Sequence, residues 1–357
     1  MSPLRIVHLD SGATWRGGQR QALLLALGLR RLGHEPFLIA SPDSPLATKA
    51  RAEGLAVATI RMRADWDLRA AKKIRSRIRA WSADIVHAHD ARSHALAMLA
   101  LMGTRAAPLI VTRRVPFTPK SARLKYGERI ARFIAISNAV RDAMVGGGIH
   151  PDRIDVVHSG IALPSVTVAP RDWRDELGWP ADSIIAGVVG AMTVEKGTDS
   201  LALMSHHLGD SVAAHRLRLL MIGGARGGDI SLGRLAGYST GFIDDIQPAM
   251  AGLDFLIHPS RAEGLGTAVL DAMALGVPPV AFSVGGLTEV IAHEESGLLV
   301  PPGDLAALAA AVARMVSDPG LRARLAEGAR NRAQSFDEAR MTKGTEAVYN
   351  RVLGGWR

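Results

Sequence analysis

The residues with the clearest chemical potential are two carboxylates, Glu263 and Asp271, which stand eight positions apart with Gly264 and Gly266 between them. If a helix begins just after Gly266, its first backbone N–H groups and its partial positive charge can hold a phosphate. The glycines leave that backbone open to a ligand. Carboxylates on either side of a diphosphate can accept hydrogen bonds from hydroxyls, the pattern that a nucleotide sugar presents. The alternative is that both acids merely complement the helix dipole.

The neighbouring residues predict the elements that would position these groups. The apolar run 254–257 is too short for a helix and is ended by His258-Pro259, so it indicates a buried strand. A helix is expected from Thr267 to Leu275, because nothing breaks the run before Gly276 and a proline pair then prevents its continuation. The loop between strand and helix therefore carries Glu263, and the helix carries Asp271.

The whole chain has the balance of a globular protein with room for two cores: 357 residues, 48% hydrophobic and 22% charged. It has no cysteine, which excludes disulfides, thiolate metal sites and cysteine nucleophiles and suits a reducing compartment. No secretory signal is visible, and no apolar run approaches the ~20 residues that span a bilayer. We therefore expect a cytoplasmic protein, or one peripheral on the inner face of the plasma membrane.

Strands and helices alternate through the N-terminal half, which predicts a doubly wound parallel sheet. Ligands bind such sheets at the carboxyl ends of the strands. The first strand end is followed by Gly17-Gly18, ahead of a helix expected over 19–32. A glycine pair there can cradle a phosphate or can be an ordinary tight turn. The dinucleotide fingerprint of three spaced glycines is absent, which disfavours a nicotinamide-dependent enzyme.

A later strand end carries a cluster of polar residues in the stretch DIVHAHDARSHA, namely His87, His89, Asp90 and His94. Clustered histidines can bind a metal, but residues alternating across a strand make poor tetrahedral geometry. No Asp-x-Asp pair at a strand end asks for a cation either. The sequence therefore predicts no metal site. Polar side chains that simply cap the strand end are at least as good an interpretation of the cluster.

The excess positive charge, +9 overall, is concentrated between Arg61 and Trp81, where eight basic residues face two acidic ones. Leu68, Ala71, Ile74, Ile78 and Trp81 recur at helical spacing there and are expected to pack on the sheet. The basic residues, Arg69, Lys72 and Lys73 among them, occupy the other face and repel one another. We expect that face to meet either water or an anionic lipid surface, and no nucleic acid.

A second basic stretch, TRRVPFTPKSARLKYGER, follows the strand at Leu109. Arg113 and Arg114 stand at the end of that strand, where an acceptor could approach. They would bind an acceptor phosphate or simply solvate a loop, and the sequence slightly favours the loop.

The string EGLGTAVLDAMALGVPPVA, from Glu263 to Ala281, closely resembles the donor-binding signature of the retaining glycosyltransferases of family GT4. Three departures from the family pattern stand out. The second signature acid is Asp271 instead of Glu, the place of an acidic residue after Gly17-Gly18 is taken by Arg20, and Ala191 replaces an Arg that helps to neutralise the diphosphate. The segment VEKGTDSL around Lys196 and the segment GFIDD around Ile243 also match the family.

The resemblance implies specific roles. Glu263 would hold the donor sugar, Lys196 would neutralise the diphosphate, and His89 would contact the sugar near its reacting carbon, with His94 in reserve. Asp271 would bind the ribose, Ile243 would lie beside the base, and Gly17 and Gly18 would meet the donor. The diphosphate would rest on the backbone of Gly264, Leu265, Gly266 and Thr267.

The resemblance also implies an α/β GT-B fold, with two facing Rossmann-like doubly wound domains and an interdomain cleft. We expect an N-terminal acceptor-side domain over 1–165, a donor-binding domain over 166–335, and a helix over 336–357 crossing back to the first domain. The implied activity is retaining, metal-independent transfer of a sugar from a UDP- or GDP-sugar to a lipid-linked or envelope glycan acceptor, without a cofactor. Alternatives are a nucleotide-sugar epimerase or isomerase on this fold and a non-catalytic donor-binding subunit.

Overall fold

The computed structural model describes residues 2–116, 127, 129–164, 166–190, 193–209 and 211–356. Ala191 and most of the second basic stretch lie outside the described residues. The chain divides into two compact units: unit 1 comprises Met1–Ala162 and Asp337–Arg357, and unit 2 comprises Leu163–Phe336. Among the described helices, none combines the length and the hydropathy that a bilayer span requires.

Unit 1 is built on a parallel sheet whose described strands are ordered β3-β2-β1-β4-β5-β6-β7. Its strands are β1 (Arg5–Leu9), β2 (Glu35–Ala40), β3 (Ala56–Thr59), β4 (Ile85–Ala88), β5 (Leu109–Arg113), β6 (Ile130–Ala135) and β7 (Ile154–Val156). Its helices are α1 (Gly17–Arg31), α2 (Pro45–Ala52), α3 (Leu68–Ala80), α4 (Ala91–Leu101), α6 (Asn138–Gly146) and α15 (Glu338–Gly355), with a 3₁₀ turn, η1 (Pro151–Arg153). The order is that of a doubly wound sheet, as the alternation of strands and helices predicts.

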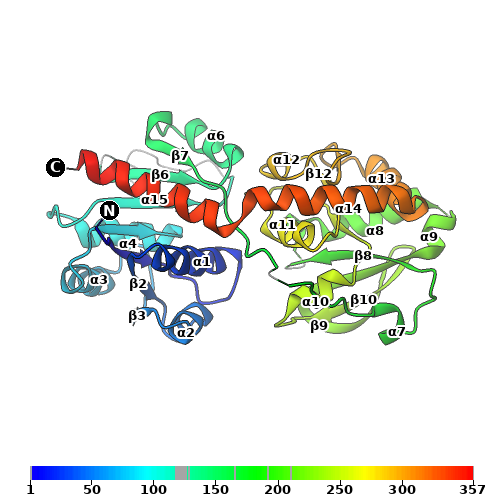
Figure 1. The fold of residues 1–357 in the computed structure, drawn as a ribbon, viewed down its shortest axis with the longest axis horizontal. Helices are drawn as coiled ribbons and strands as arrows, with labels where there is room; N and C mark the ends of the chain where they lie inside the picture. The colour runs from blue at the N-terminus through cyan, green and yellow to red at the C-terminus, as the bar shows by residue number, and fades with distance from the viewer. Residues whose placement is uncertain are drawn as a thin grey trace. The chain divides into compact units, whose positions relative to one another are not determined.

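The register of the sheet brings two functional loops together in unit 1. Strand β1 pairs in parallel with β4, and His8 lies opposite His87. The loops that follow these strands therefore leave the same edge of the sheet. On one face, α1 and α15 share a core with the central strands, and Tyr349 of α15 is fully buried in it. Figure 1 shows α15, in red, running along unit 1.

Unit 2 has a second sheet, ordered β10-β9-β8-β11-β12-β13 in the described chain. Its strands are β8 (Ile184–Val189), β9 (Leu217–Leu232), β10 (Leu235–Gly241), β11 (Phe255–His258), β12 (Pro279–Phe282) and β13 (Leu298–Val300). Its helices are α7 (Trp173–Glu176), α8 (Thr198–Leu208), α9 (Val212–Arg216), α10 (Ile246–Ala251), α11 (Thr267–Ala274), α12 (Leu287–Val290), α13 (Leu305–Ser317) and α14 (Pro319–Ala333). Two 3₁₀ turns are η2 (Val194–Lys196) and η3 (Gln334–Phe336).

The strand β9 is longer than the sequence indicates. The apolar run 217–222 predicts a short strand followed by a glycine-rich loop, but β9 continues to Leu232 and pairs antiparallel with β10. Glycines at 223, 224 and 228 have φ values of 116°, 85° and 132°, which other residues rarely adopt. The glycine-rich segment is therefore part of an irregular hairpin, and register shifts interrupt the pairing.

The basic helix α3 differs from the expectation at one end. Ala71, Ile74 and Ile78 are buried as predicted, and the Trp81 ring stacks on Phe37 with centroids 4.8 Å apart. Leu68, however, is 71% exposed. It is the first residue of the helix, directly after the N-cap Asp67, and it lines a surface pocket beside the end of α4. Its assignment to the core face was wrong.

Candidate functional site

In unit 2, close packing of glycines shapes the loop between β11 and α11. Gly266 caps α11 with φ 94°, and no side chain caps this helix end. A Cβ on Gly285 would lie 2.0 Å from the carbonyl oxygen of Glu263, and a Cβ on Gly286 would lie 2.4 Å from that of Gly264. The Gly285-Gly286 pair therefore lets the next loop pack directly on the backbone at Glu263 and Gly264. This packing holds the first backbone N–H groups of α11 in place.

A second loop brings Lys196 to the same place. Gly197 has φ 69°, and a Cβ there would lie 1.9 Å from the carbonyl oxygen of Pro259. The backbone N–H of Arg261 donates to the carbonyl of Glu195 (3.0 Å), and the Ser260 hydroxyl donates to the same oxygen (3.2 Å). The EKG turn is thus bound to the residues just before Glu263, although many residues separate them along the chain.

Glu263 is the centre of this cluster. Its Oε2 accepts from Lys196 Nζ at 2.5 Å and lies 3.1 Å from His258 Nε2. Burial by itself would raise the pKa of the carboxyl, but the hydrogen bond and charge of His258 and the charge of Lys196 outweigh it and lower the pKa to about 2. Glu263 is therefore ionised at any physiological pH, beside a cation and the N-terminus of α11.

This pKa makes a prediction about stability. The pKa of Glu263 lies near 2 in the folded chain against 4.5 ordinarily, so its stabilisation is complete above 4.5 and disappears as the pH falls toward 2. We expect Glu263→Gln to lower the free energy of unfolding by about 3 kcal/mol at neutral pH, and by progressively less below pH 4.5. Urea unfolding of both proteins across that range measures this. A difference that stays constant down to the lowest pH would contradict the assigned pKa.

The other predicted donor-site residues of unit 2 lie on neighbouring segments. Thr267 opens α11 and Asp271 follows one turn later, half-buried, while Leu265 is buried beneath the loop. Ile243 is half-buried just after β10, next to Phe242, which is 70% exposed. The structure thus brings Lys196 and Glu263 together with the start of α11, while Ile243 lies on a separate segment of the same unit.

In unit 1, the predicted His89 lies in a buried group of three histidines with His8 and His87. His8 Nδ1 and His89 Nε2 are 2.9 Å apart, and Arg114 Nη2 lies 3.3 Å from His89 Nδ1. His87 contacts the Tyr349 hydroxyl at 2.6 Å and the Thr112 hydroxyl at 2.7 Å. Strands β1, β4 and β5 and the helix α15 therefore converge on one network.

The protons of this network can be assigned because a guanidinium only donates. Arg114 donates to His89 Nδ1, so His89 carries its proton on Nε2 and donates it to His8 Nδ1. Burial, followed by the charges of His87, His8 and Arg114, holds the pKa of His89 well below 6.5. Burial likewise lowers the pKa of His8 to about 3. Both rings are neutral, and His89 presents a hydrogen-bond acceptor toward Arg114.

Arg114 does not solvate a loop, although the sequence slightly favours that role. Its side chain is half-buried against His89, and a Cβ on Gly18 would lie 3.6 Å from its Cδ. Burial lowers its pKa to about 10, so it remains a cation. Gly17 and Gly18 form the first turn of α1, which contains no acidic residue. Arg114 therefore adds a positive charge beside the glycine pair, whereas Arg113 ends β5.

Asp10, which follows β1, is a further member of this site. It is buried, and Gln19 Nε2 donates to it at 2.9 Å, as does the backbone N–H of Gly12 at 2.8 Å. Burial and the charge of Asp90 raise its pKa. Asp90 itself caps α4 and accepts from Ser11 at 2.6 Å. Together these acids fix the loop between β1 and α1, which leads directly into Gly17 and Gly18.

The three histidines offer ligand atoms within 4.8 Å of one another, close enough to raise the question of a metal. The chemistry of the donors argues against it. Both nitrogens of His87 and of His89 have hydrogen-bond partners, and the cation Arg114 lies against His89. A divalent ion would have to break these contacts and to tolerate a neighbouring positive charge. The cluster is better suited to positioning the His89 ring.

Several residues of these sites are not predicted from the sequence. His258 ends the buried strand β11, and its polar side chain in an apolar run is the signal that could have revealed it. His8, near the end of the first strand, and Asp10, directly after it, form a similar signal in the string HLD. Tyr349 gives no local signal, because only the packing of α15 on unit 1 places its hydroxyl beside His87.

Comparison with known proteins agrees with this architecture. The model for glycosyltransferase family 4 matches residues 15–163, and the model for glycosyl transferases group 1 matches residues 183–318. A D-inositol 3-phosphate glycosyltransferase of Salinispora arenicola is 30% identical over 315 residues, covering 76% of this chain and 70% of that protein. Alignments with further curated enzymes of this name span about half of those proteins.

Solved structures share the fold. Alr3699/HepE of Anabaena, in complex with UDP-glucose, superimposes with a TM-score of 0.84 at 21% identity, over 97% of this chain and 100% of that one. The lipopolysaccharide outer core galactosyltransferase WaaB, in its apo form, gives 0.73 at 16% identity, over 98% and 100%.

The two sheets, the cluster around Glu263 at the start of α11 and these similarities define a glycosyltransferase with the two-domain α/β fold called GT-B. The predicted fold class is confirmed. Two family models and a relative aligned over most of its length assign the chain more narrowly. It belongs to glycosyltransferase family 4.

Proposed function

We propose that the protein transfers a sugar from a nucleoside diphosphate sugar to a hydroxyl acceptor, with retention of anomeric configuration and without a metal. The observation that carries the proposal is the Lys196–Glu263–His258 cluster beside the N-terminus of α11. A cation and the backbone N–H groups at a helix N-terminus suit a diphosphate, and an ionised carboxylate beside them suits sugar hydroxyls. UDP-glucose is the ligand in the HepE structure, which supports UDP-sugars as the donors to test first.

The proposed chemistry is electrostatic. When the glycosidic C–O bond breaks, its electron pair goes to the nucleoside diphosphate. Lys196 and the N–H groups from Gly264 to Thr267 would stabilise that charge, which is usually the largest contribution of such a site. The acceptor oxygen forms the new bond on the face that the diphosphate leaves, and its proton passes to the leaving phosphate. Glu263 would hold the sugar, Asp271 the ribose, and His89 the sugar near its reacting carbon.

The acceptor is proposed to be a lipid-linked or envelope glycan presented at the cytosolic membrane face. The exposed basic face of α3 supports an acceptor that lies at an anionic membrane surface. A galactosyltransferase of the lipopolysaccharide outer core shares the fold. Arg114 is a candidate for an acceptor phosphate, because it remains a cation and lies beside Gly18.

A donor screen tests this function. We expect one of the UDP-, GDP-, ADP- and CMP-sugars to raise the melting temperature by several degrees, because a ligand that binds only the folded chain stabilises it. With that donor, release of the nucleoside diphosphate should depend on added lipid extract, and NMR of the product should show the donor's anomeric configuration. Turnover of the donor to another nucleotide sugar without acceptor would favour an epimerase, and tight binding without turnover would favour a binding subunit.

A further inference from the structure

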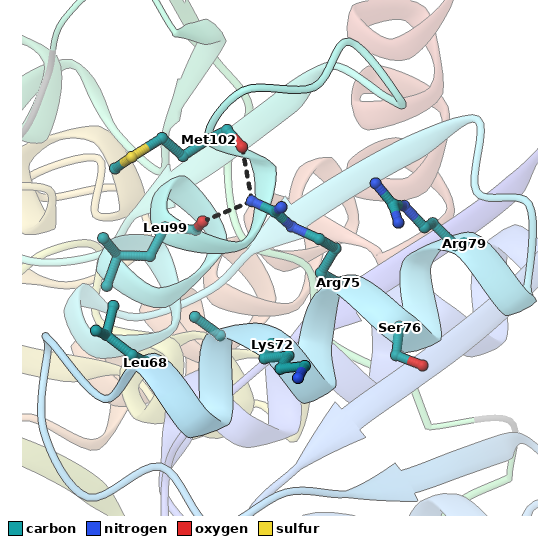
Figure 2. Close-up of a pocket in the computed structure, with 8 residues that line it drawn as sticks. Leu68, Lys72, Arg75, Ser76, Arg79, Leu99 and Met102 are labelled. Atoms are coloured by element: carbon teal, nitrogen blue, oxygen red, sulfur yellow. Dashed lines mark hydrogen bonds between the residues drawn. The ribbon is translucent and has the colours of Figure 1, made fainter.

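A pocket of about 630 Å³ opens on unit 1 between α3 and the end of α4 (Figure 2). Arg75 reaches across it: its Nε donates to the carbonyl of Ala100 and its Nη2 to that of Met102, both at 2.6 Å. The guanidinium therefore caps the C-terminus of α4, where its charge also meets the negative end of the helix dipole. Arg75 thereby joins α3 to the end of α4 on one side of the pocket.

The charges around this pocket are almost all positive. Lys72 and Arg79 line it, and Arg69, Lys73 and Arg77 are exposed on the same helix. Within the described residues, none of these five side chains forms an ion pair. The two nearby acids are engaged elsewhere, since Asp67 caps α3 and Asp65 lies 3.9 Å from Arg92. Packing of α3 on the sheet accounts for its buried face but leaves this accumulation of like charge unexplained.

Large apolar side chains stand exposed beside these cations. Trp66 is 77% exposed, Leu68 is 71% exposed and Met102 is 56% exposed. Leu68 and Met102 line the pocket, and Trp66 precedes α3 by two residues. Scattered apolar residues are normal on a protein surface, but a group of them next to a basic helix face is typical of proteins that lie in a membrane interface.

We propose that this face, formed by Trp66, Leu68, Lys72, Arg79 and Met102 and called here the α3 docking surface, binds an anionic lipid bilayer. The three apolar side chains enter the headgroup region, and Lys72 and Arg79 hold a lipid phosphate at the pocket. Charge complementarity selects an anionic bilayer, and the apolar side chains distinguish it from a soluble polyanion. Binding to the bilayer is inferred from the surface alone. Only its role, bringing the enzyme to a membrane-borne acceptor, rests on the proposed function.

Sedimentation with sucrose-loaded vesicles tests the proposal on the full-length protein. We expect binding to vesicles containing 30 mol% phosphatidylglycerol, with each basic residue raising the partition coefficient about fivefold, and little binding to pure phosphatidylcholine. Lys72→Gln with Arg79→Gln should lower the partition coefficient by about thirtyfold. Leu68→Ser should lower it by about tenfold although it removes no charge. The matched controls are Arg51→Gln with Lys343→Gln, which removes two exposed charges elsewhere in unit 1, and Leu203→Ser in unit 2.

The outcomes separate the alternatives. Equal binding to neutral and anionic vesicles, or losses equal to those of the control variants, overturns the proposal. Loss of binding with the basic variant but not with Leu68→Ser, together with equal binding to single-stranded RNA, overturns it in favour of a general polyanion surface. Transfer to a soluble acceptor analogue, measured without vesicles, reports on the proposed function independently, and the docking variants should leave it unchanged.

Discussion

Replacing Glu263 with glutamine is expected to lower kcat/KM for sugar transfer by about 10³-fold, in line with the loss of one electrostatic group from an active site. The carboxylate is ionised at neutral pH because His258 and Lys196 hold its pKa near 2. Glutamine keeps the shape but cannot neutralise Lys196. The donor sugar would lose a charged acceptor, and Lys196 would lose the partner that fixes its position. Initial rates at several donor concentrations measure the effect.

Two further variants show how Glu263 acts. Glu295→Gln removes an exposed carboxylate from the same unit and should leave kcat/KM within about twofold of the parent, as expected for a surface change. If Glu263 acts mainly by placing Lys196, then Glu263→Gln should add little to the loss caused by Lys196→Gln, because contacting residues are not additive. Activity of Glu263→Gln close to that of the Glu295 control would remove Glu263 from the site.

The site in unit 2 was accessible to sequence reasoning because much of it is contiguous. The strand, the loop with Glu263 and the start of the helix at Thr267 follow from breakers and apolar runs, and the structure places α11 at Thr267–Ala274. The ion pair between Lys196 and Glu263 was not predicted. The resemblance assigns each residue a partner on the substrate; only the packing of Gly197 on Pro259, which the sequence does not show, brings Lys196 Nζ to 2.5 Å from Glu263 Oε2.

The site in unit 1 was less accessible, because four separate elements supply it. His89 was found by resemblance, but its partners come from β1, from the end of β5 and, through His87, from α15. Nothing local in the sequence distinguishes an arginine turned onto a buried histidine from one in a solvated loop. The exposure of Leu68 was missed for a similar reason: helical periodicity identifies a face, but it does not show where along the helix contact with the sheet begins.

His89→Ala is the second substitution from which we expect a large effect, a fall in kcat/KM of about 10² to 10³-fold. The imidazole carries no charge, so its contribution is directional: Nδ1 accepts a hydrogen bond, and Nε2 is occupied by His8. A sugar hydroxyl can take the place of Arg114 at Nδ1, because both donate. Alanine removes that acceptor. It also removes the hydrogen-bond partner that His89 provides to Arg114 and to His8.

His89→Gln separates the directional role from simple packing. Its carbonyl oxygen can accept from Arg114 while its amide donates to His8, so we expect it to recover at least about tenfold of the activity lost in the alanine variant. His207→Ala, on the exposed face of α8, is the matched control.

The pH profile provides the decisive readout for the charge state of His89. Because burial holds the pKa of His89 well below 6.5 in the folded chain, the ring is already neutral at pH 6.5 and above. The parent enzyme and the glutamine variant should therefore show the same pH dependence of kcat/KM near pH 6.5. A rise there in the parent that is absent from the variant is not expected. Such a rise would mean that His89 titrates as an exposed base. The assignment of protons in the network of Arg114, His89 and His8 would then be wrong.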